Sequence, residues 1–135
     1  MNKLFFGGVH PKYNKEMSTQ DPVLQTITPK TVVIPMQQHI GAPCVPLVQV
    51  GDQVKRGQKI GDAEGLCVPV HASVSGTVVA IERRPHPTAG TALAVVIEND
   101  FKDETVTNPL PGTEDEILHA IREAGIVGMG GAAFP

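Results

Sequence analysis

The glycine-rich stretch GIVGMGGAA, residues 125–133, has the composition of a phosphate-binding loop. Glycine lets backbone N–H groups approach an anion closely, as they do in phosphate nests. Gly128, Gly130 and Ala133 fit a loose G-x-G-x-x-A spacing. However, the stretch follows a predicted helix and not a strand, and no acidic residue follows about 20 positions later, so it is not a Rossmann fingerprint. For this chain alone, a flexible glycine tail is the favoured interpretation.

Cysteine is the second candidate for chemistry. Cys44 and Cys67 are the only two cysteines of the sequence, and they form no CxxC pair. The spacing therefore predicts neither a zinc site nor an iron–sulfur ligand set. We expect two free buried thiols, with a Cys44–Cys67 disulfide as the alternative. No Ser-His-Asp or Cys-His pairing is indicated by the spacing, so no catalytic residue and no metal ligand is predicted.

A weak internal repeat relates two of the five histidines. IPMQQHIGAPCVPLVQV resembles VPVHASVSGTVVAIER, since each has a Pro, then a His, then a Gly, then a β-branched run. His39 and His71 occupy equivalent positions in it, and they would bind a metal or relay a proton if they met near a pseudo-twofold axis. Histidines that are hydrogen-bonded in turns are the simpler interpretation.

The stretch VQVGDQVKRGQKIG, residues 48–61, has the pattern of a hairpin found in swinging-arm carrier domains. In those domains a lysine at a tight hairpin tip, after an acidic residue, bears biotin or lipoate. Glu64 fits the acidic residue, but Gly, Leu and Cys follow it, and the nearest lysines are Lys55 and Lys59. Covalent attachment needs a projecting primary amine at the tip. We therefore predict the scaffold without the arm.

Short strands must position these residues. Between Thr31 and Asp100 the sequence contains the apolar runs TVVIP, VPLVQV, QKIG, LCVPV, SGTVVAIE and ALAVVIEND, separated by Gly or Pro. Runs of this length and spacing predict a mainly β sandwich or barrel. With the hairpin and the repeat, they resemble the barrel-sandwich hybrid, a biotinyl/lipoyl-like fold of short strands with pseudo-twofold halves.

One C-terminal α-helix is predicted over Thr113–Ala124. The threonine caps it, Glu116 completes a capping box, and Gly125 ends it. Its isoleucine and leucine residues form one apolar stripe. We expect His119 and Arg122 on the opposite, solvated face.

The sequence thus divides into four parts. Residues 1–29 form an extended N-terminal arm, or a disordered tail as the alternative. Residues 30–100 form the hybrid domain, and residues 101–112 form a linker. Residues 113–135 hold the helix and the glycine-rich loop.

Composition excludes several classes of function. The net charge is −3, there is no long basic run, and aromatic residues make up only 4% of the chain, so we predict no nucleic-acid partner. No apolar stretch approaches the roughly 20 residues that span a bilayer. We expect a soluble or peripheral, cytoplasmic protein.

Basic residues gather in two stretches of the predicted barrel. Arg83 and Arg84, with Lys55, Arg56 and Lys59, form a predicted basic rim. A solvated face is the default interpretation. A docking patch for another subunit or for acidic ferredoxin is the alternative.

Five motifs in order support a more specific resemblance. They are GGVHP, VVIPMQQHIGAP, VGDQVKRGQKIG, VPVHASVSGTVVAIERRPHP and REAGIVGMGGAAFP. Together they resemble the N-terminal part of the RnfC family, which supplies one component of the Rnf complex, a membrane-associated, redox-driven ion pump. In that family an unmodified hybrid domain precedes a flavin- and NADH-binding domain similar to the NADH-binding subunit of respiratory complex I.

The resemblance implies a function and a set of partners. It implies an N-terminal structural and docking domain, with FMN and 4Fe-4S clusters held elsewhere in the intact protein and no cofactor in this chain alone. Gly128, Gly130, Gly131 and Ala132 would belong to the flavin/NADH loop of the intact protein. The implied partners are the other Rnf subunits, ferredoxin, and NADH through the flavin domain. The implied location is peripheral, at the cytoplasmic face of the cell membrane.

The chain reaches Pro135 inside the motif that opens the flavin domain in this family. We therefore expect a fragment of a longer protein, which performs no chemistry alone and whose intact form is a subunit of an NAD:ferredoxin oxidoreductase. The alternative is an independent biotinyl/lipoyl-type carrier or small-molecule-binding hybrid domain.

Overall fold

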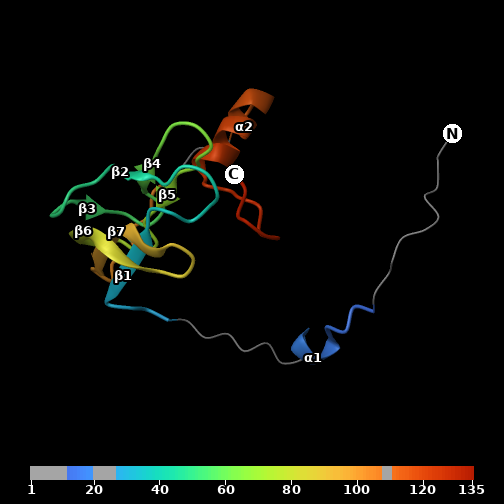
Figure 1. Cartoon of the computed structure of the whole chain (residues 1–135), viewed down its shortest axis with the longest axis horizontal. Coiled ribbons are helices and arrows are strands. Elements are labelled where there is room, and N and C mark those ends of the chain that lie inside the picture. Colours follow the sequence, from blue (N-terminus) through green and yellow to red (C-terminus); the bar gives the residue numbers. More distant parts are fainter. Residues whose placement is uncertain (1–11, 20–26, 108–110) are drawn as a thin grey trace.

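Two antiparallel sheets form the body of the protein (Figure 1). The structure is a computed structural model that describes residues 12–19, 27–107 and 111–135. The strands are β1 (Thr31–Pro35), β2 (Val45–Pro46), β3 (Gln53–Val54), β4 (Lys59–Asp62), β5 (Val70–His71), β6 (Gly76–His86) and β7 (Gly90–Asn99), and the helices are α1 (Glu16–Thr19) and α2 (Glu114–Glu123).

The larger sheet has the strand order β1-β7-β6-β3. Its centre is the long β6–β7 hairpin, whose register runs from Gly76 opposite Asn99 to His86 opposite Gly90. A register shift between Val78 and Ala80 marks a bulge in β6, which bends the strand. This curvature lets the sheet wrap around one side of the core.

The smaller sheet, of order β2-β4-β5, closes the other side of the same core. The buried cluster draws on both sheets and on the loops between them: Ile34, Met36, Cys44, Val48, Val54, Ile60, Cys67, Val70, Ala72, Val78, Val95 and Ile97. The predicted fold class, a mainly β barrel-sandwich hybrid with one C-terminal helix, is confirmed. α1 adds a single turn that the sequence did not predict.

Strand boundaries differ from the prediction where charged residues or proline interrupt the apolar pattern of a strand. β6 continues beyond Glu82 through Arg83, Arg84 and Pro85, because these side chains face solvent while their backbone pairs with β7. In contrast, only Val45 and Pro46 of the predicted run VPLVQV form β2, and the Leu47 N–H adds one bond to the Ile60 carbonyl at 2.9 Å. The chain then turns at residues 50–51.

The chain enters and leaves the hybrid domain at neighbouring points. The Asn99 backbone N–H donates to the Lys30 carbonyl at 2.8 Å, and its side-chain amide donates to the Pro29 carbonyl at 3.0 Å. The Ser75 hydroxyl donates to the Asp100 carboxylate at 2.7 Å, which fixes the turn that follows β7. The domain therefore begins and ends at the same end of the β1–β7 strand pair.

The first half of the predicted linker packs on the domain. Arg56 donates its backbone N–H to the Glu104 carbonyl at 2.8 Å, and Val106 donates to the Arg56 carbonyl at 3.0 Å. Two ion pairs accompany these bonds, Lys55–Glu104 at 3.3 Å and Arg56–Asp103 at 3.0 Å. The chain beyond β7 thus runs along the β3–β4 hairpin.

α2 begins where the sequence predicts. The Thr113 hydroxyl accepts from the Glu116 N–H at 3.4 Å, and the Glu116 carboxylate accepts from the Thr113 N–H at 2.9 Å. This is the predicted capping box. No helix in the described part of the chain is both long and apolar enough to cross a membrane.

Candidate functional site

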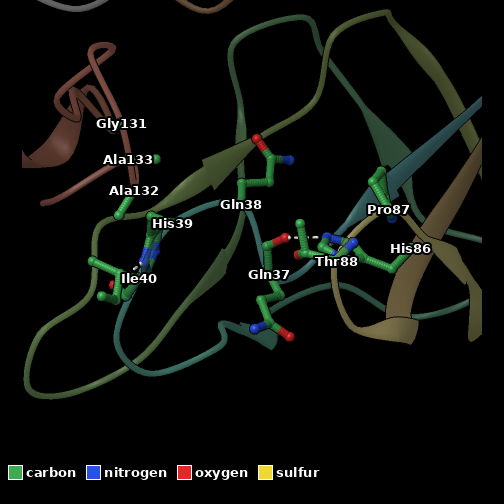
Figure 2. A pocket seen from close by; sticks show the side chains of 10 residues that line it. All are labelled: Gln37, Gln38, His39, Ile40, His86, Pro87, Thr88, Gly131, Ala132 and Ala133. Carbon is green, nitrogen blue, oxygen red and sulfur yellow. Dashed lines mark hydrogen bonds between the residues drawn. The ribbon is translucent and has the colours of Figure 1, made fainter.

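A cavity of about 440 Å³ lies where the glycine-rich loop meets the hybrid domain (Figure 2). Three segments line it: residues 37–40 after β1, residues 86–88 in the β6–β7 turn, and residues 131–133 of the loop. Figure 2 shows Ala132 and Ala133 beside His39 and Ile40, with Pro87 and Thr88 on the opposite side. The cavity is thus built from parts that are far apart in the sequence.

Hydrogen bonds hold the walls of this cavity together. His86 donates from Nε2 to the Gln37 carbonyl at 2.8 Å, while its Nδ1 accepts from the Ala89 N–H at 3.2 Å. The Ile40 N–H donates to the carbonyls of Ala132 and Ala133 at 3.2 and 3.3 Å. The glycine-rich loop is therefore fixed to the 37–40 segment by its backbone.

The structure separates the predicted loop residues into two groups. Gly131 and Ala132 line the cavity. Gly128 donates its N–H to the Phe134 carbonyl at 2.8 Å, and a side chain added at Gly130 would meet nothing within 4 Å. Among the described residues, the cavity lining contains no lysine or arginine, so a role for the loop in binding phosphate stays a prediction.

His39 lies between the cavity and the core. It lines the cavity and is only 7% exposed. Its Nε2 is 3.6 Å from Cys67 Sγ, which in turn is 3.4 Å from Cys44 Sγ. These three ligand atoms lie within 4.8 Å of one another. The structure therefore brings together one histidine and both cysteines, as a group that could hold a metal.

The spacing arguments missed this group because its members come from different turns. His39 and Cys44 flank Gly41, whose φ of +104° suits a glycine turn, and the Ala42 N–H donates to the Leu66 carbonyl at 3.0 Å. That bond places Cys67 beside Cys44. Both cysteines are free thiols, as expected. Their contact with His39 depends on a tertiary pairing that no local motif encodes.

His71 has other surroundings. It is half-buried in β5, opposite Lys59 of β4. Gly125, the residue that ends α2, packs on it: an added Cβ there would lie 3.4 Å from the His71 ring and 2.5 Å from the Pro69 carbonyl. Burial, the largest influence, lowers the pKa of His71. Unlike His39, this histidine lies against the end of α2.

Four charged side chains clamp α2 to β4. Arg122 makes a two-pronged contact with Asp62, at 2.9 Å from Nη2 and 3.2 Å from Nη1. Lys59 bonds to Asp62 at 3.2 Å and also to Glu123. The prediction that Arg122 is merely solvated is therefore wrong. The capping box and stripe placed it on the polar face but could not show what that face contacts.

The pKa values of the clamp show which charges it favours. Burial alone would raise the pKa of Asp62, but bonds from Arg122, the Ala63 N–H and Lys59 outweigh burial and lower it. The bond from Lys59 is the largest influence on Glu123 and lowers its pKa. The bond to Glu123 raises the pKa of Lys59. All of these shifts favour the ionised clamp.

We expect Arg122→Gln to lower the free energy of unfolding at pH 7 by about 1 kcal/mol, because the two-pronged pair is partly buried. The difference from wild type should shrink as the pH falls below the ordinary carboxyl range near 4. A carboxyl whose pKa is lowered by folding stabilises the fold above its unfolded pKa and loses that effect as it gains a proton. Denaturant titrations at several pH values measure this.

The matched control is Arg84→Gln, which removes an ion pair with Glu82 whose side chains are about half exposed. Its effect should be a few tenths of a kcal/mol at most, because exposed pairs are screened by water and salt. Equal losses in the two variants, or an Arg122→Gln loss that does not depend on pH, would show that the clamp contributes nothing specific.

The predicted basic rim is largely neutralised. Each of four of its cations has a carboxylate partner: Lys55, Arg56, Lys59 and Arg84 pair with Glu104, Asp103, Asp62 and Glu82 respectively. The fifth, Arg83, donates to the hydroxyl and carbonyl of Thr91. The rim is therefore a set of local pairs, and the geometry gives no support to a cationic docking patch for ferredoxin.

Residues 3–102 match the family described as the RnfC Barrel sandwich hybrid domain. The C subunit of the Na(+)-translocating ferredoxin:NAD(+) oxidoreductase complex of Acetobacterium woodii is 47% identical, over 97% of this chain and 31% of the relative. The C subunit of the proton-translocating ferredoxin:NAD(+) oxidoreductase complex of Clostridium ljungdahlii is also 47% identical, over 100% of this chain and 31% of the relative.

A third relative is the C subunit of the ion-translocating oxidoreductase complex of Vibrio cholerae. It is 40% identical, over 97% of this chain and 18% of the relative. The chain thus spans less than a third of the length of these three relatives.

Proposed function

The chain belongs to the RnfC family through its barrel sandwich hybrid domain, and from this premise we propose that it is the N-terminal structural and docking domain of an RnfC protein. The proposed assembly is an ion-translocating ferredoxin:NAD(+) oxidoreductase complex, since the relatives are named as subunits of such complexes. In this role the domain does no chemistry. It holds a flavin domain and neighbouring subunits in position.

The observation that carries this proposal is the outward face of α2. Ile117, Leu118 and Ile121 are 45%, 62% and 44% exposed, and no residue of the helix is buried. The last turn of the helix is anchored to β4 by the Arg122–Asp62 contact. A helix held by its polar residues, with its apolar stripe outward, is suited to packing against another domain or subunit.

The same proposal gives the glycine-rich loop a role in the intact protein. By family resemblance, Gly128, Gly130, Gly131 and Ala132 would contribute to a flavin and NADH site, with FMN and the 4Fe-4S clusters bound mainly by other residues. The loop's anchoring to Ile40 supports this, because a loop fixed to the hybrid domain would be presented in a defined orientation. NADH and ferredoxin would then react outside this domain.

The carrier alternative is not favoured. Glu64 lies at an exposed tip without a lysine. Lys59 is held by Asp62 and Glu123, and Lys55 pairs with Glu104. Neither amine is presented at the hairpin tip that a carrier arm would need.

We expect Leu118→Asp to impair assembly of the complex. In a full-length RnfC protein that contains this sequence, expressed with its partner subunits, recovery of the assembled complex by affinity purification should fall by about tenfold or more, because a charge would be buried at the interface. The melting temperature of the 135-residue chain should change little, since Leu118 is largely exposed.

The matched control is His119→Asp, which adds the same side chain at the neighbouring exposed position off the apolar stripe. It should leave assembly near the wild-type level. Full recovery of the complex with Leu118→Asp, or the same loss with both variants, would contradict the docking role of the stripe.

A further inference from the structure

His39, Cys44 and Cys67 form the densest group of metal-ligating side chains in the described part of the chain. They are 7%, 4% and 4% exposed. The turn at Gly41 and the strand-like bond from Ala42 to Leu66 bring them together. The turn leaves no room for a larger residue, because a Cβ on Gly41 would lie 2.2 Å from the Leu66 carbonyl oxygen.

The tautomer of His39 directs a lone pair into this group. In the tautomer with the proton on Nδ1, that nitrogen donates to the Ile40 carbonyl at 3.0 Å and Nε2 accepts from the Val68 N–H at 3.3 Å. A backbone carbonyl that fixes Nδ1–H is the usual second contact of a histidine that binds a metal through Nε2.

The Val68 carbonyl completes a four-atom cage. Its oxygen is 3.1 Å from His39 Nε2, 3.3 Å from Cys44 Sγ and 3.6 Å from Cys67 Sγ. As thiols, Cys44 and Cys67 can donate to this oxygen, while the Val68 N–H donates to His39 Nε2 at 3.3 Å. A cation at the centre of the cage would replace these weak hydrogen bonds with metal–ligand bonds.

The spacing of the cage matches a zinc ion. Zinc bonds of about 2.3 Å to sulfur and about 2.0–2.1 Å to nitrogen at tetrahedral angles imply S···S of about 3.8 Å and S···N of about 3.6 Å. The corresponding distances here are 3.4 Å between the two sulfurs and 3.6 Å between Cys67 Sγ and His39 Nε2. Shifts of a few tenths of an ångström would admit the ion.

We propose that His39, Cys44 and Cys67, with the Val68 carbonyl oxygen, form a mononuclear Zn²⁺ site that joins the 36–44 loop to the 66–68 segment. Binding would transfer two thiol protons to solvent and leave two zinc–thiolate bonds, one zinc–imidazole bond and one zinc–carbonyl bond. No oxidation is involved. The ion would reach the cage from the adjoining cavity, which His39 lines (Figure 2).

Removing the two thiol protons costs free energy, which the zinc–ligand bonds must offset. Burial, and then the neighbouring Cys67, raise the pKa of Cys44 to about 12. Without a cation Cys44 therefore remains a thiol at neutral pH. Zinc supplies the compensating charge, as it does when it deprotonates cysteines in other structural sites.

Co(II), a tetrahedral substitute for zinc, tests the site in the reduced 135-residue chain under anaerobic conditions. We expect one equivalent to bind, with thiolate-to-cobalt charge transfer in the near ultraviolet and intense visible bands of tetrahedral cobalt. One equivalent of Zn²⁺ should abolish these bands. Since the sequence has only two cysteines and the charge-transfer intensity scales with the number of bound thiolates, that intensity in the wild type reports whether both Cys44 and Cys67 bind.

Variants then test each ligand. Cys44→Ser, Cys67→Ser and His39→Gln should each weaken Zn²⁺ binding by at least about 100-fold. His71→Gln, at the equivalent position of the internal repeat, should bind as the wild type does. A cobalt spectrum with only weak octahedral bands, binding unaffected by the cysteine variants, or no bound metal would overturn the proposal. If the variants do not fold, the wild-type spectrum still decides it.

Discussion

Gly76→Ala should lower the free energy of unfolding by about 3 kcal/mol or more. Gly76 begins β6 with φ of +154°, and a Cβ there would lie 1.9 Å from the Glu98 carbonyl oxygen and 2.9 Å from its carbon. Both atoms belong to the backbone of β7, the strand that pairs with β1 and β6. They cannot rotate away, so the central hairpin must open. Equilibrium denaturation measures the loss.

The control for this prediction is Gly51→Ala. Gly51 has φ of +99°, but an added Cβ would meet nothing within 4 Å. Only the left-handed backbone is then penalised, at about 1 kcal/mol. Gly76→Ala should therefore cost at least twice as much as Gly51→Ala. Similar losses would mean that the strand pair yields easily and that the close approach at Gly76 matters little.

Ile60→Ala should cost about 3 kcal/mol of stability and should weaken both sheets together. Ile60 lies in β4 of the smaller sheet and is 0% exposed, within a cluster that includes Val95 and Ile97 of the larger sheet. Removing three carbons from a packed core leaves a cavity as well as losing apolar burial. Because the core is shared, slowly exchanging amides in β4 and β7 should lose equal protection in hydrogen exchange.

Val79→Ala provides the comparison, because Val79 is 42% exposed at the bulge of β6. Its loss should stay within about 0.5 kcal/mol. If Ile60→Ala lowered protection only in β4 while β7 kept its full value, the two sheets would be separate units. The single-core description would then be wrong.

The elements that sequence analysis predicted best are those whose signals are local. Thr31–Pro35 is a β-branched run that ends at proline, and it is β1 residue for residue. The capping box fixes the start of α2 through two adjacent hydrogen bonds. In both cases the residues that define the element also contact one another, so their pattern is readable without the rest of the fold.

The candidate sites were harder to predict because they depend on contacts across the fold. Arg122 and Asp62 are 60 positions apart, and His39 and Val68 are 29 apart. The residues next to Arg122 in the sequence do not show whether its side chain pairs with a distant carboxylate or is solvated. The internal repeat singled out His39 but related it to His71. In the structure, the turn at Gly41 directs His39 to the two cysteines instead. A search for every His and Cys near a glycine turn would have raised that candidate.

The contacts of Asn99 with Pro29 and Lys30 have a consequence for how the protein could be rearranged. Because the chain enters and leaves the domain at adjacent positions, a short peptide could link residues 29 and 100 directly. New termini could then be placed in the exposed turn at 87–89. Such a circular permutant would keep every strand pair outside that turn. A domain whose two ends lie this close together can be inserted into a loop of another protein without distorting the chain on either side.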